Sequence, residues 1–329
     1  MIWDDPREYV RGVLSGDRRM LAKTITLVES ALPAHQQLAR AIIDQLLPHA
    51  GRAVRLGITG VPGVGKSTFI ESLGSLLVED GRQVAVLAVD PSSQRSGGSI
   101  MADKTRMEKL STRERAFIRP SPSGGTLGGV ARKTRETMIV CEAAGYDVMI
   151  VETVGVGQSE TTVASMVDFF LVLMLAGAGD EIQGIKKGVL ELADAIAVNK
   201  ADGDNLEKAE RARQQYEMAL HYLRPSSPSW IPPVLKCSSL EENMTGIRRL
   251  WQTVLDHRER LDASGELAAK RKAQALEWMW SLIMEGLKDR FYGHPKVKRK
   301  LPQVINEVKN GRIGPTAAAA ELLFLLDKD

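Results

Sequence analysis

Three glycines, a lysine and a serine are spaced for chemistry on phosphate groups. Residues 60–67 read GVPGVGKS and match the pattern GxxxxGKS at every required position. The glycines let the backbone turn so tightly that successive N–H groups point at phosphate oxygens, at the positive end of the following helix. Lys66 would neutralise the β and γ phosphates, and the Ser67 hydroxyl would bind Mg²⁺. The predicted phosphate-binding residues are Gly60, Val61, Gly63, Val64, Gly65, Lys66, Ser67 and Thr68.

A second motif predicts which base accompanies those phosphates. Residues 199–202 read NKAD and follow the apolar stretch 195–198. NKxD is the guanine-reading motif of G proteins, in which the carboxylate, here Asp202, accepts hydrogen bonds from guanine N1–H and the exocyclic amine. Adenine lacks that pair of donors. Asn199 is expected to tie the base loop to the phosphate loop, and the stem of Lys200 to cover the base. Ser238, Ser239 and Leu240 resemble the last base-binding loop of G proteins.

Carboxylates end two further apolar stretches. Asp90 closes residues 84–90 and Glu152 closes residues 146–152. Many P-loop enzymes place an acid here to hold Mg²⁺ or its water shell. Common G proteins have DxxG at the second place, whereas this chain has ETVG. The extra methylene of Glu152 favours a water-mediated contact.

The residue after Gly155 is not the glutamine that orients the attacking water in Ras-like proteins. We therefore expect slow intrinsic GTP hydrolysis, with kcat below ~1 s⁻¹. Slow turnover is typical of a switch rather than of a metabolic catalyst.

Alternating apolar and helical segments must position these residues. Strands are predicted near residues 53–59, 84–90, 146–152, 169–176, 195–199 and 233–236. The alternation predicts an α/β fold, a P-loop G domain with a mainly parallel sheet and helices on both faces, and a ligand at the carboxyl ends of the strands.

Helical extensions are predicted on both sides of that domain. We expect an N-terminal helical extension over residues 1–50, a P-loop GTPase domain over 51–260, and a C-terminal helical arm over 261–329. Within the arm, a long helix over 265–286 is expected to end before a break at 291–300. The basic run 296–300 is expected to be a solvated turn between helices.

Composition excludes several classes of function. A net charge of +3 over 329 residues gives no case for a nucleic-acid surface. The two cysteines, Cys141 and Cys237, lie far apart, which favours buried, reduced thiols and a cytoplasmic location. The longest apolar run, 169–176, suits a buried strand rather than a membrane span. The acidic start of the chain lacks the apolar core of a secretory signal.

Taken together, these motifs closely resemble the MeaB/ArgK type of G protein, which includes MMAA-like proteins. These are GTPase chaperones of adenosylcobalamin-dependent methylmalonyl-CoA mutase. The resemblance spans nearly the whole chain and is most specific between residues 55 and 245. It is carried by residues 60–67, 89–93, 103–107, 152–160, 177–188 and 199–202.

The resemblance implies a set of properties beyond the motifs themselves. It implies binding of GTP or GDP with Mg²⁺, association with methylmalonyl-CoA mutase, gating of adenosylcobalamin delivery from an adenosyltransferase, and protection or reactivation of the mutase. It also implies a homodimer formed through the C-terminal arm.

The resemblance also assigns roles to residues. Lys66 would contact phosphate, Ser67 and Asp103 would surround Mg²⁺, and Asp90 and Glu152 would assist in the metal and water network. Loop 177–188 matches the third switch of the family, which couples nucleotide state to the mutase. The coupling residues would be Asp180, Glu181, Gln183 and Lys186.

Two other functions remain open alternatives. A nickel-insertion GTPase needs a metal site, but this chain has no His-rich tract and only two isolated cysteines. A P-loop kinase linked to amino-acid transport would generally use ATP, which Asp202 argues against. It would also need an acceptor-substrate site, which the motifs do not include.

Overall fold

The structure is a computed structural model of the chain. It describes residues 5–89, 107–120, 127–153, 159–176, 187–223, 227–240 and 244–326. By internal contacts the chain divides into two compact units, Met1–Lys272 and Ala273–Asp329.

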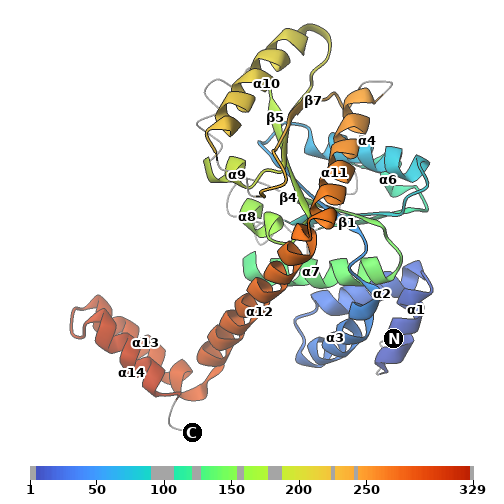
Figure 1. Cartoon of the computed structure of the whole chain (residues 1–329). Helices are drawn as coiled ribbons and strands as arrows, with labels where there is room; N and C mark the ends of the chain where they lie inside the picture. The colour runs from blue at the N-terminus through green and yellow to red at the C-terminus, as the bar shows by residue number, and fades with distance from the viewer. Residues whose placement is uncertain are drawn as a thin grey trace. The chain divides into compact units, whose positions relative to one another are not determined.

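The first unit is built on a seven-stranded parallel sheet with the strand order β3-β2-β4-β1-β5-β6-β7 (Figure 1). The predicted α/β class is therefore confirmed. Six of the strands lie where the sequence predicts them. The strands are β1 (Val54–Gly60), β2 (Val84–Val89), β3 (Ala116–Arg119), β4 (Val148–Thr153), β5 (Phe169–Leu175), β6 (Ala195–Asn199) and β7 (Val234–Lys236).

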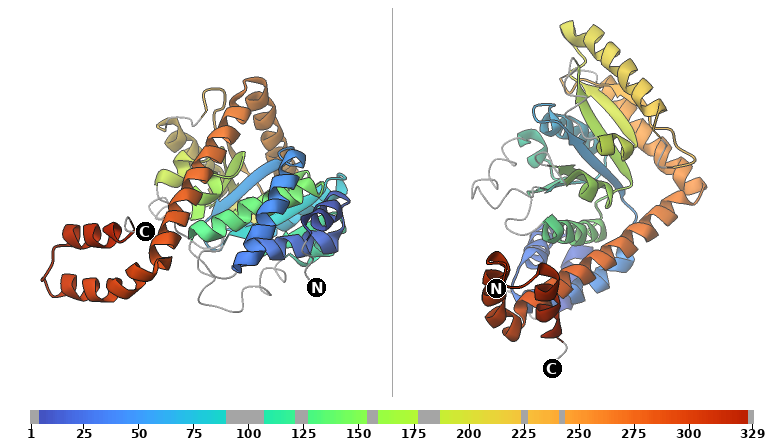
Figure 2. Two further views of the ribbon diagram at one scale, coloured as in Figure 1. Left: turned by 90° about the horizontal axis from the view of Figure 1, so that it is seen from below. Right: turned by 90° about the vertical axis from the view of Figure 1, so that its left-hand side faces the viewer.

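Helices cover both faces of this sheet (Figures 1 and 2). On one face, α4 (Lys66–Glu79) contacts β1 and β2, and α11 (Thr245–Ala263) contacts β5, β7 and α4. The other face carries α7 (Leu127–Ala143) on β2, α8 (Ser159–Ala164) on β1, β4 and β5, and α10 (Leu206–His221) on β6 and β7. The shorter helices are α6 (Glu108–Ser111), α9 (Lys187–Glu191) and η2 (Gly203–Asn205).

Burial on both faces explains why the strands read as apolar runs rather than alternating patterns. All six residues of β2 are buried, and so are all six of β4. Because every pair is parallel, the carboxyl ends of the strands meet at one edge of the sheet. The phosphate and base motifs lie at that edge.

Three N-terminal helices form a bundle beside the sheet. They are α1 (Pro6–Leu14), α2 (Arg18–Glu29) and α3 (Pro33–Leu46), followed by the short η1 (Leu47–His49), and all three contact α7. Arg18 donates hydrogen bonds to the carbonyls of Glu114 (2.7 Å) and Ala116 (2.9 Å). The bundle thereby binds the start of the edge strand β3.

A polar network lies at the opposite, amino edge of the sheet. Asp168 and Asp194 directly precede β5 and β6. Arg271 donates to both carboxylate oxygens of Asp168 (2.8 and 2.7 Å) and to the carbonyl of Ala53 (2.8 Å), just before β1. Lys270 donates to the carbonyl of Asp168 (2.6 Å). The first turns of the C-terminal helix are thus tied to the starts of β1 and β5.

The helix that carries Arg271 is longer than predicted. It is α12 (Glu266–Gly293), which begins in the first unit and continues into the second. The expectation of a turn at residues 296–300 is wrong, because these residues lie in α13 (Pro295–Lys309). Pro295 occupies the first turn of that helix, where a missing N–H costs nothing, so it starts a helix rather than a loop.

The second unit has its own small apolar core. There α13 packs against α14 (Pro315–Phe324), with Val304, Ala318 and Leu322 buried between them. No helix in the described part of the chain combines the length and the apolar composition that a bilayer crossing requires.

Both cysteines are buried free thiols, as expected, and burial raises the pKa of the Cys141 thiol.

Candidate functional site

The phosphate loop joins the end of β1 to the start of α4, as the motif predicts. A Cβ atom on Gly60 would lie 2.5 Å from the carbonyl oxygen of Leu173, so only glycine fits against the neighbouring strand. Gly65 has a φ of 91°, in the left-handed region that favours glycine, and its Cβ would meet the Asn199 amide at 3.1 Å. The backbone therefore depends on both glycines.

The loop leads into a helix whose amino end is the kind of position that binds anions. Lys66, Ser67 and Thr68 form the first turn of α4, the position at which a helix attracts phosphate. The ammonium group of Lys66 donates to the carbonyl of Gly60 (2.7 Å), which holds the side chain over the loop. Val64 is fully buried and anchors the loop in the core.

Two residues of the NKAD motif contact this loop directly. The Asn199 amide donates to the carbonyl of Val64 (2.9 Å), which is the tie between base loop and phosphate loop that the sequence predicts. Lys200 donates to the carbonyl of Gly63 (2.9 Å) and has a φ of 57°, uncommon for a residue other than glycine. The base motif and the phosphate motif therefore form one continuous structure.

The loop after β7 completes the candidate base site. The Ser238 hydroxyl donates to the Asp202 carboxylate and accepts from the Leu240 amide (3.2 Å). The Ser239 hydroxyl donates to the Asn199 side-chain oxygen (3.3 Å). The structure thus brings together all the residues predicted for guanine binding, although they come from two separate parts of the chain.

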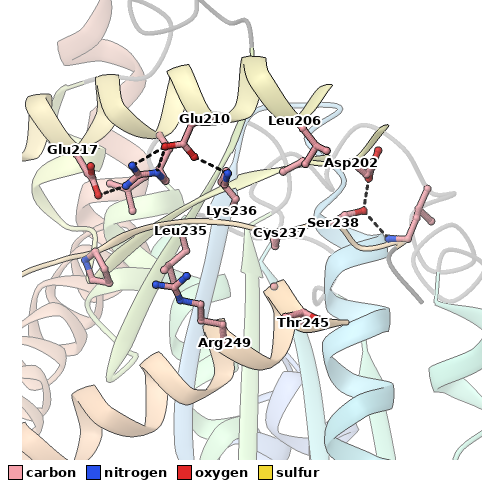
Figure 3. A pocket seen from close by; sticks show the side chains of 16 residues that line it. Asp202, Leu206, Glu210, Glu217, Leu235, Lys236, Cys237, Ser238, Thr245 and Arg249 are labelled. Carbon is pink, nitrogen blue, oxygen red and sulfur yellow. Dashed lines mark hydrogen bonds and ion pairs between the residues drawn. The ribbon is translucent and has the colours of Figure 1, made fainter. Parts of the chain in front are cut away.

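A cavity of about 860 Å³ opens beside this loop (Figure 3). Asp202, Ser238 and Leu240 line one end, and α10, β7 and α11 form the walls. On the α10 side, Glu210 accepts from Lys236 of β7 (2.6 Å) and from Arg213 (2.8 Å).

That ion network is not among the features predicted from the sequence. Hydrogen bonds from Arg213 and Lys236 lower the pKa of Glu210 to about 2. The pairing of Glu210 with Arg213 could be predicted from the sequence, because residues three apart lie on one face of a helix. The pairing of Glu210 with Lys236 could not be predicted, because it depends on the placement of β7 beside α10.

Of the predicted metal and switch residues, the structure describes Ser67 and Glu152. Glu152 is buried near the end of β4, in register with Ile58 of β1 and Ala88 of β2. This register places it beside the strand that leads into the phosphate loop. The remaining predicted residues, Asp90, Asp103, Asp180, Glu181, Gln183 and Lys186, lie outside the described residues.

Within the described ranges, no group of three or more His, Cys, Asp and Glu residues could hold a metal ion. This finding leaves the predicted Mg²⁺ set open, since two of its carboxylates, Asp90 and Asp103, lie outside those ranges. Ser67 and Glu152 themselves present the hard oxygen donors that Mg²⁺ prefers.

The comparison that decides the family covers most of the chain. Residues 21–296 match the family model described as methylmalonyl Co-A mutase-associated GTPase MeaB. The chain belongs to this MeaB family.

Several relatives and a solved structure match the chain over more than three quarters of their own length. The GTPase ArgK of Escherichia coli is 49% identical over 315 residues, which are 96% of this chain and 95% of the relative. The mitochondrial methylmalonic aciduria type A homolog of Mus musculus is 45% identical, over 95% of this chain and 77% of the relative. A crystal structure described as LAO/AO transport system kinase has a TM-score of 0.78 and 42% identity, and the match covers 100% of this chain and 99% of that one.

Family and geometry agree on the reaction. A MeaB-family chain with an intact phosphate loop joined to a guanine-type base loop is a P-loop GTPase, which binds GTP and hydrolyses it to GDP and phosphate.

Proposed function

We propose that this MeaB-family GTPase associates with methylmalonyl-CoA mutase, gates the delivery of adenosylcobalamin to it from an adenosyltransferase, and protects or reactivates the mutase. The family match over residues 21–296 carries the proposal, because its description names a mutase-associated GTPase. The 45% identity to a methylmalonic aciduria type A homolog supports it.

In the proposed site, the base loop selects GTP and the phosphate loop holds it. Asp202 would accept from the guanine N1–H and amine, and Lys66 would leave the Gly60 carbonyl to contact the β and γ phosphates. Ser67, with Asp90, Asp103 and Glu152, would hold Mg²⁺ directly or through water. The metal would supply charge stabilisation on the phosphates. The buried position of Glu152 beside β1 fits this role.

Communication with the mutase requires that the mutase bind the GTP and GDP forms unequally. We assign this coupling to the segment that follows β5, with Asp180, Glu181, Gln183 and Lys186. Strand β5, which precedes this segment in the sequence, lies between β1 and β6, the strands that lead into the phosphate and base loops. Bound nucleotide and bound mutase would therefore act on neighbouring parts of the same edge.

The test is GTP hydrolysis by the purified protein with Mg²⁺, with and without the cobalamin-dependent mutase. We expect turnover below ~1 s⁻¹ for the protein alone and an increase on adding mutase, as an activator produces. ATP is the control for base selectivity. GTP turnover that is indifferent to mutase, together with no detectable complex by analytical ultracentrifugation, would contradict the proposed partner.

We also propose a homodimer formed through the C-terminal arm. In α12 a row of large apolar side chains is exposed at helical spacing, which is typical of a helix that packs against a partner. Their exposed fractions run from 41% to 61%. The row consists of Leu276, Met279, Trp280, Ile283, Met284 and Leu287.

A second candidate function is phosphoryl transfer to another protein. It is favoured by one observation, the 42% identity to a chain described as LAO/AO transport system kinase. Incubation with GTP or ATP labelled on the γ-phosphate distinguishes the two candidates. Label in inorganic phosphate supports the GTPase switch, whereas label transferred to a protein acceptor supports the kinase.

A further inference from the structure

A serine in the middle of α4 hydrogen-bonds to the base loop. The Ser72 hydroxyl, on the phosphate-loop helix, donates to the backbone carbonyl of Ser239 at 3.0 Å. The two residues are 167 positions apart in the chain. A serine inside a helix commonly faces solvent or bonds to the carbonyl four residues earlier, so this long-range bond sets Ser72 apart.

The bond closes a circuit of contacts around the candidate nucleotide site. Asn199 binds the phosphate loop at Val64 (2.9 Å), and Ser239 binds Asn199 (3.3 Å). Ser72 then joins Ser239 back to the helix that begins at the phosphate loop. The base loops are therefore held to the phosphate-loop segment by Asn199, by Lys200 and by Ser72, of which Ser72 is the one outside the recognised motifs.

The residue next to Ser239 holds the base-reading carboxylate. Ser238 is 3% exposed, and its hydroxyl donates to Asp202. A shift of the Ser239 backbone would move this donor and with it the carboxylate that faces guanine. Among the described residues, Ser72 bonds to Ser239 and Asp202 bonds to Ser238, so any effect of Ser72 on the base acts through residues 238 and 239.

We infer that Ser72 is a positioning residue for the guanine site, which sets the lifetime of the bound nucleotide by holding the loop at residues 238–240 against α4. This inference rests on the proposed assignment of Asp202 to guanine. The loop has to separate from the phosphate-loop segment for nucleotide to leave, and the Ser72 hydrogen bond opposes that separation. Hydrolysis chemistry takes place at the phosphates, away from this bond.

The experiment measures release of fluorescent GDP from the full-length protein with Mg²⁺, after addition of excess unlabelled GDP. Ser72→Ala is expected to release GDP about fivefold faster than wild type, the factor that one ordinary hydrogen bond contributes. The value of kcat at saturating GTP should stay unchanged. Ser72→Thr, which keeps the hydroxyl, should restore the wild-type rate to within about twofold.

The matched control is Ser75→Ala. Ser75 lies on the same helix and is half-buried like Ser72, but within the described part of the chain its side chain makes no hydrogen bond to the base loop. Release from Ser75→Ala should equal that from wild type. Equal release from Ser72→Ala and Ser75→Ala would overturn the inference. If Ser72→Ala lowers the midpoint of thermal unfolding, the GDP release rates of Ser72→Val and Ser72→Thr are compared instead. These two side chains have nearly the same shape and differ in the hydroxyl group.

A change of base separates a positioning role from a general structural one. Inosine diphosphate lacks the exocyclic amine that Asp202 would accept from, so displacement of the carboxylate costs less with this base. The acceleration caused by Ser72→Ala should then be smaller for inosine diphosphate than for GDP. The same acceleration for both nucleotides would count against the inference. Failure of the wild-type protein to prefer GDP over inosine diphosphate would instead refute the guanine site itself.

Discussion

Asp202 is the residue on which base selection depends in the proposed site. One of its carboxylate oxygens accepts from Ser238, and the backbone that leads to Asp202 is fixed by the bonds of Asn199 and Lys200 to the phosphate loop. The carboxylate is therefore held in place before nucleotide binds, which reduces the entropy lost on binding.

Replacing Asp202 by Asn tests this role. The amide offers one acceptor and one donor in place of two acceptors, so one guanine donor loses its partner. We expect GDP affinity to fall by about 2 to 3 kcal/mol, or roughly 30- to 150-fold, the loss typical of a hydrogen bond to a charged group. Xanthine, which has a carbonyl where guanine has the amine, should bind the variant better than the wild type.

Titration calorimetry with GDP and xanthosine diphosphate checks this prediction. Asp204→Asn, two residues further on in the exposed turn η2, is the control and should bind GDP normally. Unchanged GDP affinity in Asp202→Asn would show that guanine is read elsewhere.

At this scale the sequence predicts residues that belong to local motifs and misses those that act across the fold. Lys66, Asn199 and Asp202 are recognisable because their spacing along the chain defines them. Ser72 is an ordinary helical serine until its partner, 167 residues away, is known. The ion pair of Lys236 with Glu210 likewise cannot be predicted without knowing that β7 packs beside α10.

Among the elements, α12 is anchored to the amino edge of the sheet by a buried ion pair between Arg271 and Asp168. The side chain of Asp168 is 3% exposed and that of Arg271 20%, and two hydrogen bonds join them. Burial disfavours the charged form of Asp168, but the hydrogen bonds and charge of Arg271 outweigh it, so the pKa of this carboxyl lies below its usual value.

Removing the arginine leaves that buried charge without its main partner. Arg271→Met should lower the free energy of unfolding by about 3 kcal/mol, at the low end for a broken buried ion pair. Urea denaturation followed by circular dichroism measures the change. Lys272→Met, at the exposed neighbouring position, should stay within about 0.5 kcal/mol of wild type. A similar small effect for Arg271→Met would mean that the pair contributes little to stability.

The lowered pKa of Asp168 also predicts a dependence on pH. A carboxyl with a depressed folded pKa contributes stability above its unfolded pKa of about 3.9, and this stability is lost as pH falls through the folded value. The stability difference between wild type and Asp168→Asn should therefore be constant near neutral pH and shrink below about pH 4. Urea midpoints at several pH values test this, and a difference that grows on acidification would contradict it.

Strands that bury apolar side chains on both faces can be predicted from the sequence. Short elements that depend on contacts with distant parts of the chain cannot. Strand β2 is visible as an unbroken run of alanine, valine and leucine. Strand β3 is not predictable in this way, because it has only four residues and ends in Arg119, which pairs with Glu29 of α2. The basic run at 296–300 predicts a solvated turn, but Val297 within it is fully buried and the run lies in α13.

For the molecule as a whole, the proposed dimer depends on the apolar row of α12. Ile283→Glu would place a charge in that row, and we expect it to convert dimer to monomer at micromolar concentration while GTP turnover of the protein alone persists. Sedimentation equilibrium measures the mass. Ser281→Glu adds the same charge about 160° around the helix and should remain a dimer. A wild-type protein that sediments as a monomer would refute the proposal.

The tie between Asn199 and the phosphate loop has a consequence for how the protein is made on the ribosome. The two partners are 135 residues apart, and Ser239 follows later still. A nascent chain that has emerged as far as β5 already contains the whole GVPGVGKS segment, but neither the amide that holds its backbone nor the carboxylate that reads the base. Translation has to pass residue 239 before the site can close. Only a chain whose G domain has been fully synthesised therefore binds GTP tightly. Fragments that end earlier do not bind cellular GTP tightly.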